Sequence, residues 1–160
     1  MMRDGLLGLV AGATGTLALE ITTYGDMLVR GRPPSSVPAR MAGVLADRLG
    51  IEALSTTRSD ERSENRRGAA GALLGYATGL GIGVLYGLLR GRAGGRVATP
   101  LAGVGVGLAA MAASDVSIAL TGVSDPRTWT PADWASDVIP HLVYGLVTVE
   151  TYEAATRTAV

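Results

Sequence analysis

Four long apolar stretches alternate with shorter polar segments along the chain. A helix that crosses the hydrocarbon core of a bilayer needs roughly 20 predominantly apolar residues, at about 1.5 Å per residue. The pattern therefore predicts an all-α membrane protein, in which four transmembrane helices form a bundle and residues 1–160 form one domain. The expected helices span about residues 5–27, 68–89, 97–122 and 132–155.

The four stretches differ in how well they suit lipid. Gly68–Leu89 contains 22 residues without a charge, whereas a soluble helix of that length would normally show a polar stripe. The third stretch is uncharged until Asp115, the first carries Glu20, and the fourth carries Asp137 and His141. We expect these ionisable side chains to face protein rather than lipid. A soluble helical protein rich in Gly and Ala is the alternative interpretation.

The segment between the first two stretches has a different composition. Pro33 and Pro34 end the first helix, because paired prolines cannot continue it. Ser36 is placed as an N-cap with Pro38 in the first turn, which predicts a short amphipathic helix over about residues 37–49. This helix would lie in the membrane interface or cap the bundle. The charged run that follows it, at residues 58–67, is a connector, the first turn of the next helix or a docking surface for a partner.

The fourth helix has a clear start signal. Thr130 is the expected N-cap, Pro131 occupies the first helical position, and Asp133 follows in the first turn. Trp129 and Trp134 flank this start, where aromatic side chains line the membrane interface. We therefore expect both tryptophans to be interfacial.

Glycine recurs at every fourth residue of the second stretch. In lipid, helices associate through close backbone approach, which a ridge of small residues permits. The first and third stretches repeat the pattern more briefly, so these faces are expected to pack within the bundle or against another subunit. The predicted packing glycines are Gly71, Gly75, Gly79, Gly83 and Gly87 in the second stretch, Gly8 and Gly12 in the first, and Gly103 and Gly107 in the third.

Five polar side chains fall at similar depths when residues are counted along alternating helices. Glu20, Asp115 and His141 each lie about 21–24 Å from the side of the chain termini, and Asp137 lies one turn from His141. Tyr76 falls at comparable depth from the opposite side. The cluster is either a proton- or ion-binding site or a hydrogen-bonded clasp that fixes the helix register. A metal site is less favoured, because one His with scattered carboxylates is a weak ligand set.

Composition excludes several classes of function. Fourteen basic residues, all Arg, balance 14 acids, so an excess of positive charge for nucleic acid is absent. No Cys is present, which excludes disulfides, thiolate metal ligands and a Cys nucleophile. The sequence shows no nucleophile–base triad, phosphate loop or haem signature, so we predict no enzyme, no catalytic residue, no metal and no cofactor.

Two regions resemble the YagU-like family of small bacterial inner-membrane proteins. One is the opening helix, residues 5–12, leading to Arg32-Pro-Pro-Ser-Ser-Val-Pro38. The other is the last helix, with Thr121–Ser124, Trp134–Asp137, His141–Gly145 and Glu150. The resemblance implies a four-helix membrane protein with both termini cytoplasmic, and it implies no reaction. The Arg-only, Ala- and Gly-rich composition is typical of a high-GC bacterium such as an actinobacterium.

The positive-inside rule gives two conflicting signals. Eight Arg lie between Arg30 and Arg67, and three lie in the short loop between Arg90 and Arg96, yet these loops face opposite sides in a four-helix protein. We follow the resemblance, which places the short loop inside the cell.

The leading functional prediction is a non-enzymatic integral membrane subunit. Its partners would be the lipid bilayer and either further copies of itself or a larger membrane complex, joined through the glycine-rich faces. The alternative is a small proton or ion transporter or channel that uses the Glu/Asp/His cluster.

Overall fold

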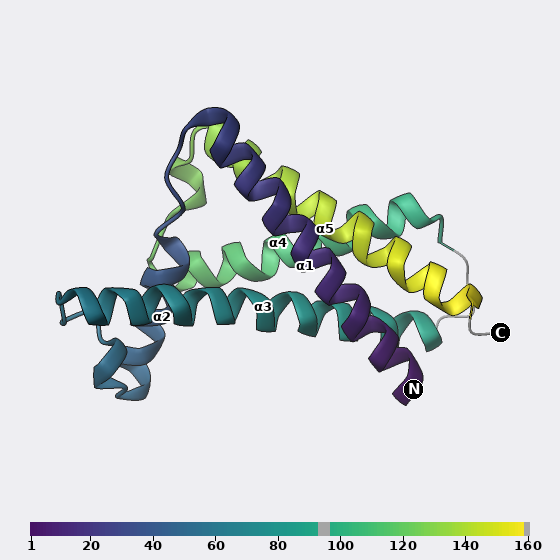
Figure 1. Ribbon diagram of the computed structural model, residues 1–160, viewed down its shortest axis with the longest axis horizontal. Helices are drawn as coiled ribbons and strands as arrows, with labels where there is room; N and C mark the ends of the chain where they lie inside the picture. Colours follow the sequence, from purple (N-terminus) through teal and green to yellow (C-terminus); the bar gives the residue numbers. More distant parts are fainter. Residues whose placement is uncertain (93–96, 159–160) are drawn as a thin grey trace.

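The computed structural model describes residues 1–92 and 97–158, and these residues form helices joined by turns (Figure 1). No strand occurs in either range. The α-helices are α1 (Met2–Arg30), α2 (Val37–Leu49), α3 (Glu61–Arg92), α4 (Thr99–Thr121) and α5 (Pro131–Thr158), with short 3-10 turns η1 (Glu52–Leu54) and η2 (Pro126–Thr128). The fold is therefore all-α, as the pattern predicts.

Local signals explain most helix ends. The α2 helix occupies Val37–Leu49 and ends at Gly50, whose φ of 69° lies in the left-handed region that favours glycine. At the start of α5, the Thr130 backbone N–H donates to Asp133 Oδ2 at 2.9 Å, and the Asp133 N–H donates to Thr130 Oγ1 at 3.2 Å. This reciprocal capping confirms the predicted N-cap at Thr130 and makes Pro131 the first residue of α5.

The α3 helix begins earlier than its apolar stretch. Asp60 caps it by accepting the Ser63 backbone N–H at 3.0 Å and the Ser63 hydroxyl at 2.7 Å. These hydrogen bonds to the charged carboxylate lower the pKa of Asp60 to about 2. Most of the charged run is thus the first turns of α3, and Arg67 within it donates to the Ser55 and Arg58 carbonyl oxygens.

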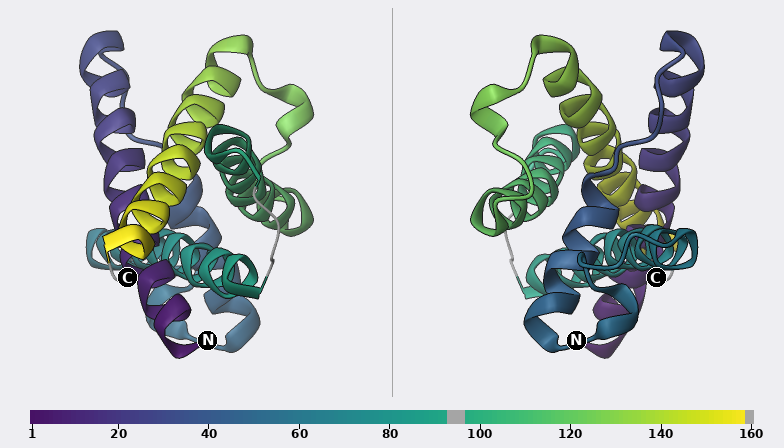
Figure 2. Two further views of the ribbon diagram at one scale, coloured as in Figure 1. Left: turned by 90° about the vertical axis from the view of Figure 1, so that its right-hand side faces the viewer. Right: turned by 90° about the vertical axis from the view of Figure 1, so that its left-hand side faces the viewer.

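The long helices are arranged in the order α3, α1, α5, α4. The α1 helix packs against both α3 and α5, and α5 also packs against α4, whereas α3 and α4 contact each other only slightly. Figure 2 shows the resulting open arrangement from two sides, with α2 packed on the first half of α3. The central helices α1 and α5 therefore carry most of the interhelical packing.

Glycine allows the close approach of α1 to α3. A Cβ atom at Gly12 would lie 2.7 Å from the Gly79 carbonyl oxygen and 3.0 Å from the Cα of Gly83. Gly8 faces Gly83 and Gly87 in the same way, and Gly79 also faces Thr16. These helices thus meet backbone to backbone, as expected for a small-residue face.

Some of the remaining predicted packing glycines contact a neighbouring helix, and one does not. Gly107 lies against the His141 carbonyl oxygen, and Gly103 lies against Leu146, so both close the α4–α5 contact. Gly71 lies against the backbone of Pro38 in α2. A Cβ at Gly75 would meet nothing within 4 Å, so this position of the ridge is open.

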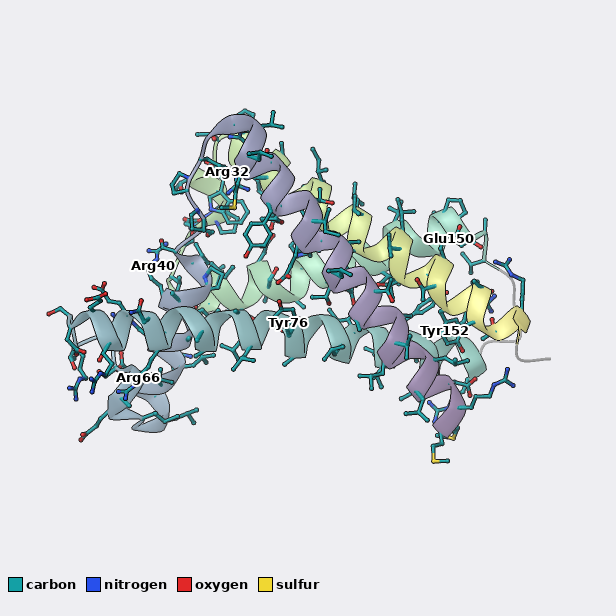
Figure 3. All side chains as sticks on the ribbon, viewed as in Figure 1. Arg32, Arg40, Arg66, Tyr76, Glu150 and Tyr152 are labelled. Atoms are coloured by element: carbon teal, nitrogen blue, oxygen red, sulfur yellow. The ribbon has the colours of Figure 1, made fainter. Side chains whose placement is uncertain are left out.

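Helices α1, α3 and α4 are long and apolar enough to cross a membrane. They expose large apolar side chains over their length, including Leu6 on α1, Leu73 on α3 and Leu120 on α4. Figure 3 shows Arg32, Arg40 and Arg66 toward the α2 end of the molecule, and Tyr152 and Glu150 toward the opposite end. These features indicate a membrane protein, because lipid covers such surfaces without penalty.

Candidate functional site

Three of the predicted polar residues meet at the α4–α5 contact. The His141 ring Nδ1 lies 2.8 Å from the Asp137 carbonyl oxygen and 3.3 Å from Asp137 Oδ1. Asp115 on α4 interacts through its side chain with Asp137 and electrostatically with His141. The helices place the group near their loop ends, because Asp115 and Asp137 each lie six residues, or about 9 Å, from the ends of α4 and α5.

The carboxyl groups of Asp115 and Asp137 each contain one buried oxygen that is not satisfied. Asp115 is 9% exposed, and its Oδ1 has no hydrogen-bond partner among the described residues. Asp137 Oδ2 is likewise buried without a partner in the described chain. Two adjacent carboxylates repel each other, and a hydrogen bond between them requires a proton on one. The arrangement can therefore hold a shared proton, with the His141 imidazole as a third proton-binding group.

A pocket of about 470 Å³ adjoins this group on the side of the α4–α5 loop. Asp115, Val116 and Ala119 supply its wall from α4, and Asp125 and Arg127 contribute from the loop. Arg127 Nη2 lies 2.9 Å from Asp125 Oδ2, so the charges at the loop neutralise each other. The Arg127 guanidinium also lowers the pKa of Asp125. Within the described chain, Asp115 is thus the carboxyl of this pocket that forms no ion pair with Arg127.

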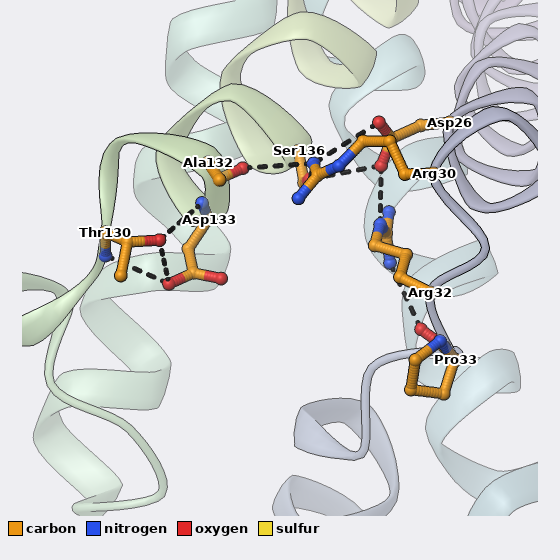
Figure 4. A network of polar contacts seen from close by, with 8 residues as sticks. All are labelled: Asp26, Arg30, Arg32, Pro33, Thr130, Ala132, Asp133 and Ser136. Atoms are coloured by element: carbon orange, nitrogen blue, oxygen red, sulfur yellow. Dashed lines mark hydrogen bonds and ion pairs between the residues drawn. The ribbon is translucent and has the colours of Figure 1, made fainter.

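A polar network joins α1 to Ser136 of α5, the residue next to Asp137 in the chain (Figure 4). Asp26 Oδ2 accepts the Ser136 hydroxyl at 3.1 Å and the Arg32 Nε–H at 2.5 Å. Arg30 Nη1 donates to Ser136 Oγ at 2.6 Å and lies 3.4 Å from Asp26 Oδ1. The network joins the end of α1 to the start of α5, and it sets charged groups beside the α4–α5 site.

Glu20 and Tyr76 form a second, separate contact. The Glu20 carboxyl interacts with the Tyr76 hydroxyl across the α1–α3 contact, and Tyr24 lies close by. Tyr76 is exposed and Glu20 is half-buried. The five residues of the predicted cluster thus fall into two groups, Glu20 with Tyr76 and Asp115 with Asp137 and His141.

The predicted interfacial tryptophans pair with each other. The rings of Trp129 and Trp134 lie 5.1 Å apart between centroids with a 59° interplanar angle, and Trp129 Nε1 donates to Ser124 Oγ at 3.0 Å. They lie at the start of α5, at the same end as the α4–α5 site. Their position stays consistent with an interfacial role.

The buried face of α5 carries three further polar side chains. Tyr144 is 1% exposed and its hydroxyl donates to the Gly79 carbonyl oxygen at 2.6 Å. Thr148 is 0% exposed, and Tyr152 is 3% exposed with its hydroxyl 3.2 Å from the Gly87 carbonyl oxygen. The polar cluster predicted from the sequence does not include Tyr144 or Tyr152. Their spacing of four residues on either side of Thr148 was the available signal.

The far end of this face meets a charged group. Arg90 Nε on α3 lies 2.8 Å from Glu153 Oε1 on α5, and the rings of Tyr86 and Tyr152 form an edge-to-face contact with centroids 5.3 Å apart. The Tyr152 hydroxyl lies 3.5 Å from Asp4 Oδ1 on α1. This group ties α1, α3 and α5 together near the chain termini.

Within the two described ranges, no group of three His, Asp or Glu side chains is placed to hold a metal ion. Comparison with protein-family models, with curated proteins and with solved structures found no match to this chain. The function is therefore argued from the geometry.

Proposed function

We propose that the chain is a multi-pass membrane protein with four transmembrane helices and that it binds and moves protons at the Asp115–Asp137–His141 group. The observation that carries the proposal is the pair of buried carboxyl oxygens, Asp115 Oδ1 and Asp137 Oδ2, that lack partners in the described chain. A group that only clasped two helices would gain stability by satisfying these atoms. A site that exchanges protons needs them available.

The proposal that α5 also crosses the membrane is supported by its packing. The helix is 28 residues long and lies between α1 and α4, two helices that are apolar enough to span. Its ionisable Asp137 and His141 lie against α4 rather than on an outer face. Ionisable groups in a membrane helix are tolerated when they face protein in this way.

The chemistry of the group suits proton exchange. One proton shared between Asp115 and Asp137 removes the repulsion between two carboxylates. His141 Nδ1 lies against two oxygens of Asp137, so the imidazole can take a second proton while Asp137 is ionised. The adjoining pocket lies on the side of the α4–α5 loop, which supports water access from that side.

The test is proton flux in sealed liposomes that contain the purified protein and an internal pH dye. The parent is expected to dissipate an imposed pH gradient, and Asp115→Asn is expected to slow this flux by roughly a hundredfold, the scale of a lost proton-transfer group. Glu150→Gln, an exposed change on α5, is the matched control. If liposomes that contain the parent protein keep the imposed pH gradient, the proposal is overturned. A flux that follows an imposed sodium gradient instead would make the ligand a sodium ion.

The second candidate is the non-enzymatic membrane subunit. It is favoured by glycines that stay unpacked in the single chain, since Cβ atoms at Gly75, Gly81 and Gly105 on α3 and α4 would meet nothing within 4 Å. A second copy or a larger complex would bury these positions. Native mass measurement on gently extracted protein tests this, and a monomer would contradict it. The YagU-like resemblance and a bacterial inner-membrane location belong to both candidates and remain proposals.

A further inference from the structure

One face of α5 carries a nearly continuous series of buried polar side chains. It begins at the proposed proton site with the half-buried Asp137 and His141, and continues through the buried Tyr144, Thr148 and Tyr152. The steps between neighbours are three or four residues, so consecutive Cβ atoms lie about 5–6 Å apart on one side of the helix. From His141 to Tyr152 the series covers eleven residues, or about 16 Å of helix.

Thr148 is the unusual member of this series. The threonine hydroxyls of Thr14, Thr16 and Thr78 each donate to the carbonyl oxygen four residues earlier in their own helix, at 2.8–2.9 Å. The Thr148 hydroxyl is fully buried and makes no hydrogen bond to the described chain. A buried hydroxyl without a partner costs about 1–3 kcal/mol. This cost is not required for packing, since Val has the same shape.

The α1 helix leaves space for the Thr148 hydroxyl. Gly15 of α1 lies directly over Thr148 Oγ1, and a Cβ there would clash with that oxygen. The Thr148 side chain also lies near the Tyr144 hydroxyl and interacts with it. The glycine thus leaves room for one hydroxyl between α1 and α5.

Both ends of the series meet groups that bind protons. At one end are Asp115, Asp137 and His141, with Asp26, Arg30 and Arg32 of α1 one turn away. At the other end the Tyr152 hydroxyl lies 3.5 Å from Asp4 Oδ1, and Glu153, Arg90 and Tyr86 are adjacent. The described chain therefore places carboxyl groups at both ends of a buried line of hydroxyls.

We propose that Tyr144, Thr148 and Tyr152 form a proton relay along α5 that connects the Asp115–Asp137–His141 site with Asp4 at the terminal end of the bundle. The inference rests on the proposed function. It adds the route and identifies the carried species as a proton, because hydroxyls can relay a proton but cannot pass a sodium ion through this packed contact.

The transfer balances at every step. His141 gives up its proton, the Tyr144 oxygen accepts it, and the original Tyr144 hydroxyl proton leaves for Thr148 Oγ1. Thr148 and Tyr152 repeat the exchange, and the last proton arrives on the Asp4 carboxylate. Each hydroxyl ends with one proton, so no phenolate forms. The Tyr144 hydroxyl must turn away from the Gly79 carbonyl oxygen, and single waters or rotamer changes complete the longer steps.

The experiment measures proton flux in the liposomes described above for Thr148→Val, Thr148→Ser and Thr78→Val. Thr148→Val keeps the shape and removes the hydroxyl, so flux should fall about tenfold or more, and Thr148→Ser should retain it. Thr78→Val is the control, because its hydroxyl is exposed and bonded within its own helix. Thermal stability in detergent should be unchanged or higher for Thr148→Val.

The outcomes separate the relay from the proposed function. If Asp115→Asn abolishes the parent's proton flux but Thr148→Val leaves it unchanged, the relay is overturned and the proton site stands. A parent without flux overturns both. Tyr152→Phe provides an independent second variant should Thr148→Val fail to fold, and parental flux in Tyr152→Phe likewise overturns the relay.

Discussion

The α1–α3 and α4–α5 contacts are both closed by glycine, but they differ in what lies beside the glycines. At α1–α3, Gly8 and Gly12 meet Gly83, and the nearby Thr16 hydroxyl is satisfied by the Gly12 carbonyl oxygen at 2.8 Å. At α4–α5, Gly107 and Gly145 make an equally close approach. Beside them, however, lie the unsatisfied oxygens of Asp115 and Asp137.

The α1–α3 contact only holds two helices together, whereas the α4–α5 contact also contains ionisable side chains. Backbone contact between glycines needs no side chain and leaves no polar atom unsatisfied. The α4–α5 contact has the same backbone closeness and could have been completed with apolar side chains. The unsatisfied oxygens of its acids therefore lower stability, a cost that functional sites commonly carry and that the proposed proton site would explain.

The largest effect is expected at the α1–α3 contact. Gly83→Leu should destabilise the extracted protein by more than about 3 kcal/mol, because the new side chain meets the Gly8 and Gly12 backbone, which cannot move aside. Gly75→Leu is the matched control on the same ridge, since it faces open space. Thermal unfolding in detergent measures both. Equal melting temperatures would mean that α3 does not pack on α1.

A smaller effect of opposite sign is expected at the α4–α5 site. Asp115→Leu should raise stability by about 1 kcal/mol, because it replaces a buried carboxyl that lacks a partner with an apolar group of similar size. Proton flux should be lost in the same variant. If Asp115→Leu instead destabilises the protein, the group is a clasp and the comparison between the two contacts fails.

Much of this architecture could be predicted from the sequence. The start of α5 at Pro131 and the extent of α2 follow from local capping and periodicity, which need no tertiary information. The early start of α3 was one of the alternatives left open, because Asp60 lies within a charged run, where a cap and a solvated connector have the same composition. Spacing of glycines also anticipated the faces used, although it could not show that Gly75 stays open.

The candidate site was predictable only in part. Residue counts give depth in a membrane, but they do not give the direction in which each helix face points. Glu20 therefore interacts with Tyr76 at the α1–α3 contact, whereas Asp115, Asp137 and His141 meet at the α4–α5 contact. The unsatisfied Thr148 hydroxyl depends on the approach of Gly15, a tertiary contact with no local signal.

Glu20 tests whether the α1–α3 contact depends on a side-chain interaction as well as on its glycines. Glu20→Gln should be tolerated, because an amide can still pair with the Tyr76 hydroxyl. Glu20→Leu should cost about 1 kcal/mol, the typical value of one lost hydrogen bond. Thermal unfolding in detergent measures both variants. Equal stability of the Leu and Gln variants would show that the α1–α3 contact depends on glycine alone.

The smallest effect is expected outside the membrane, at the Asp60 cap of α3. Its folded pKa of about 2 lies below the ordinary value of 3.8, so the charged carboxylate stabilises the fold. This stabilisation is fully present above about pH 4 and is lost as the pH falls toward 2. Asp60→Asn keeps a capping oxygen but cannot titrate in this range.

The measurement is the difference in melting temperature between parent and Asp60→Asn at a series of pH values. Taking the difference cancels the titration of Asp115, Asp137 and the other acids, which both proteins share. The parent should be the more stable at pH 6, and its advantage should shrink between pH 4 and pH 2 as the Ser63 hydrogen bonds lose their charged acceptor. A difference that stays constant with pH would mean that Asp60 does not cap α3 as a carboxylate, and the helix would then begin nearer to its apolar stretch.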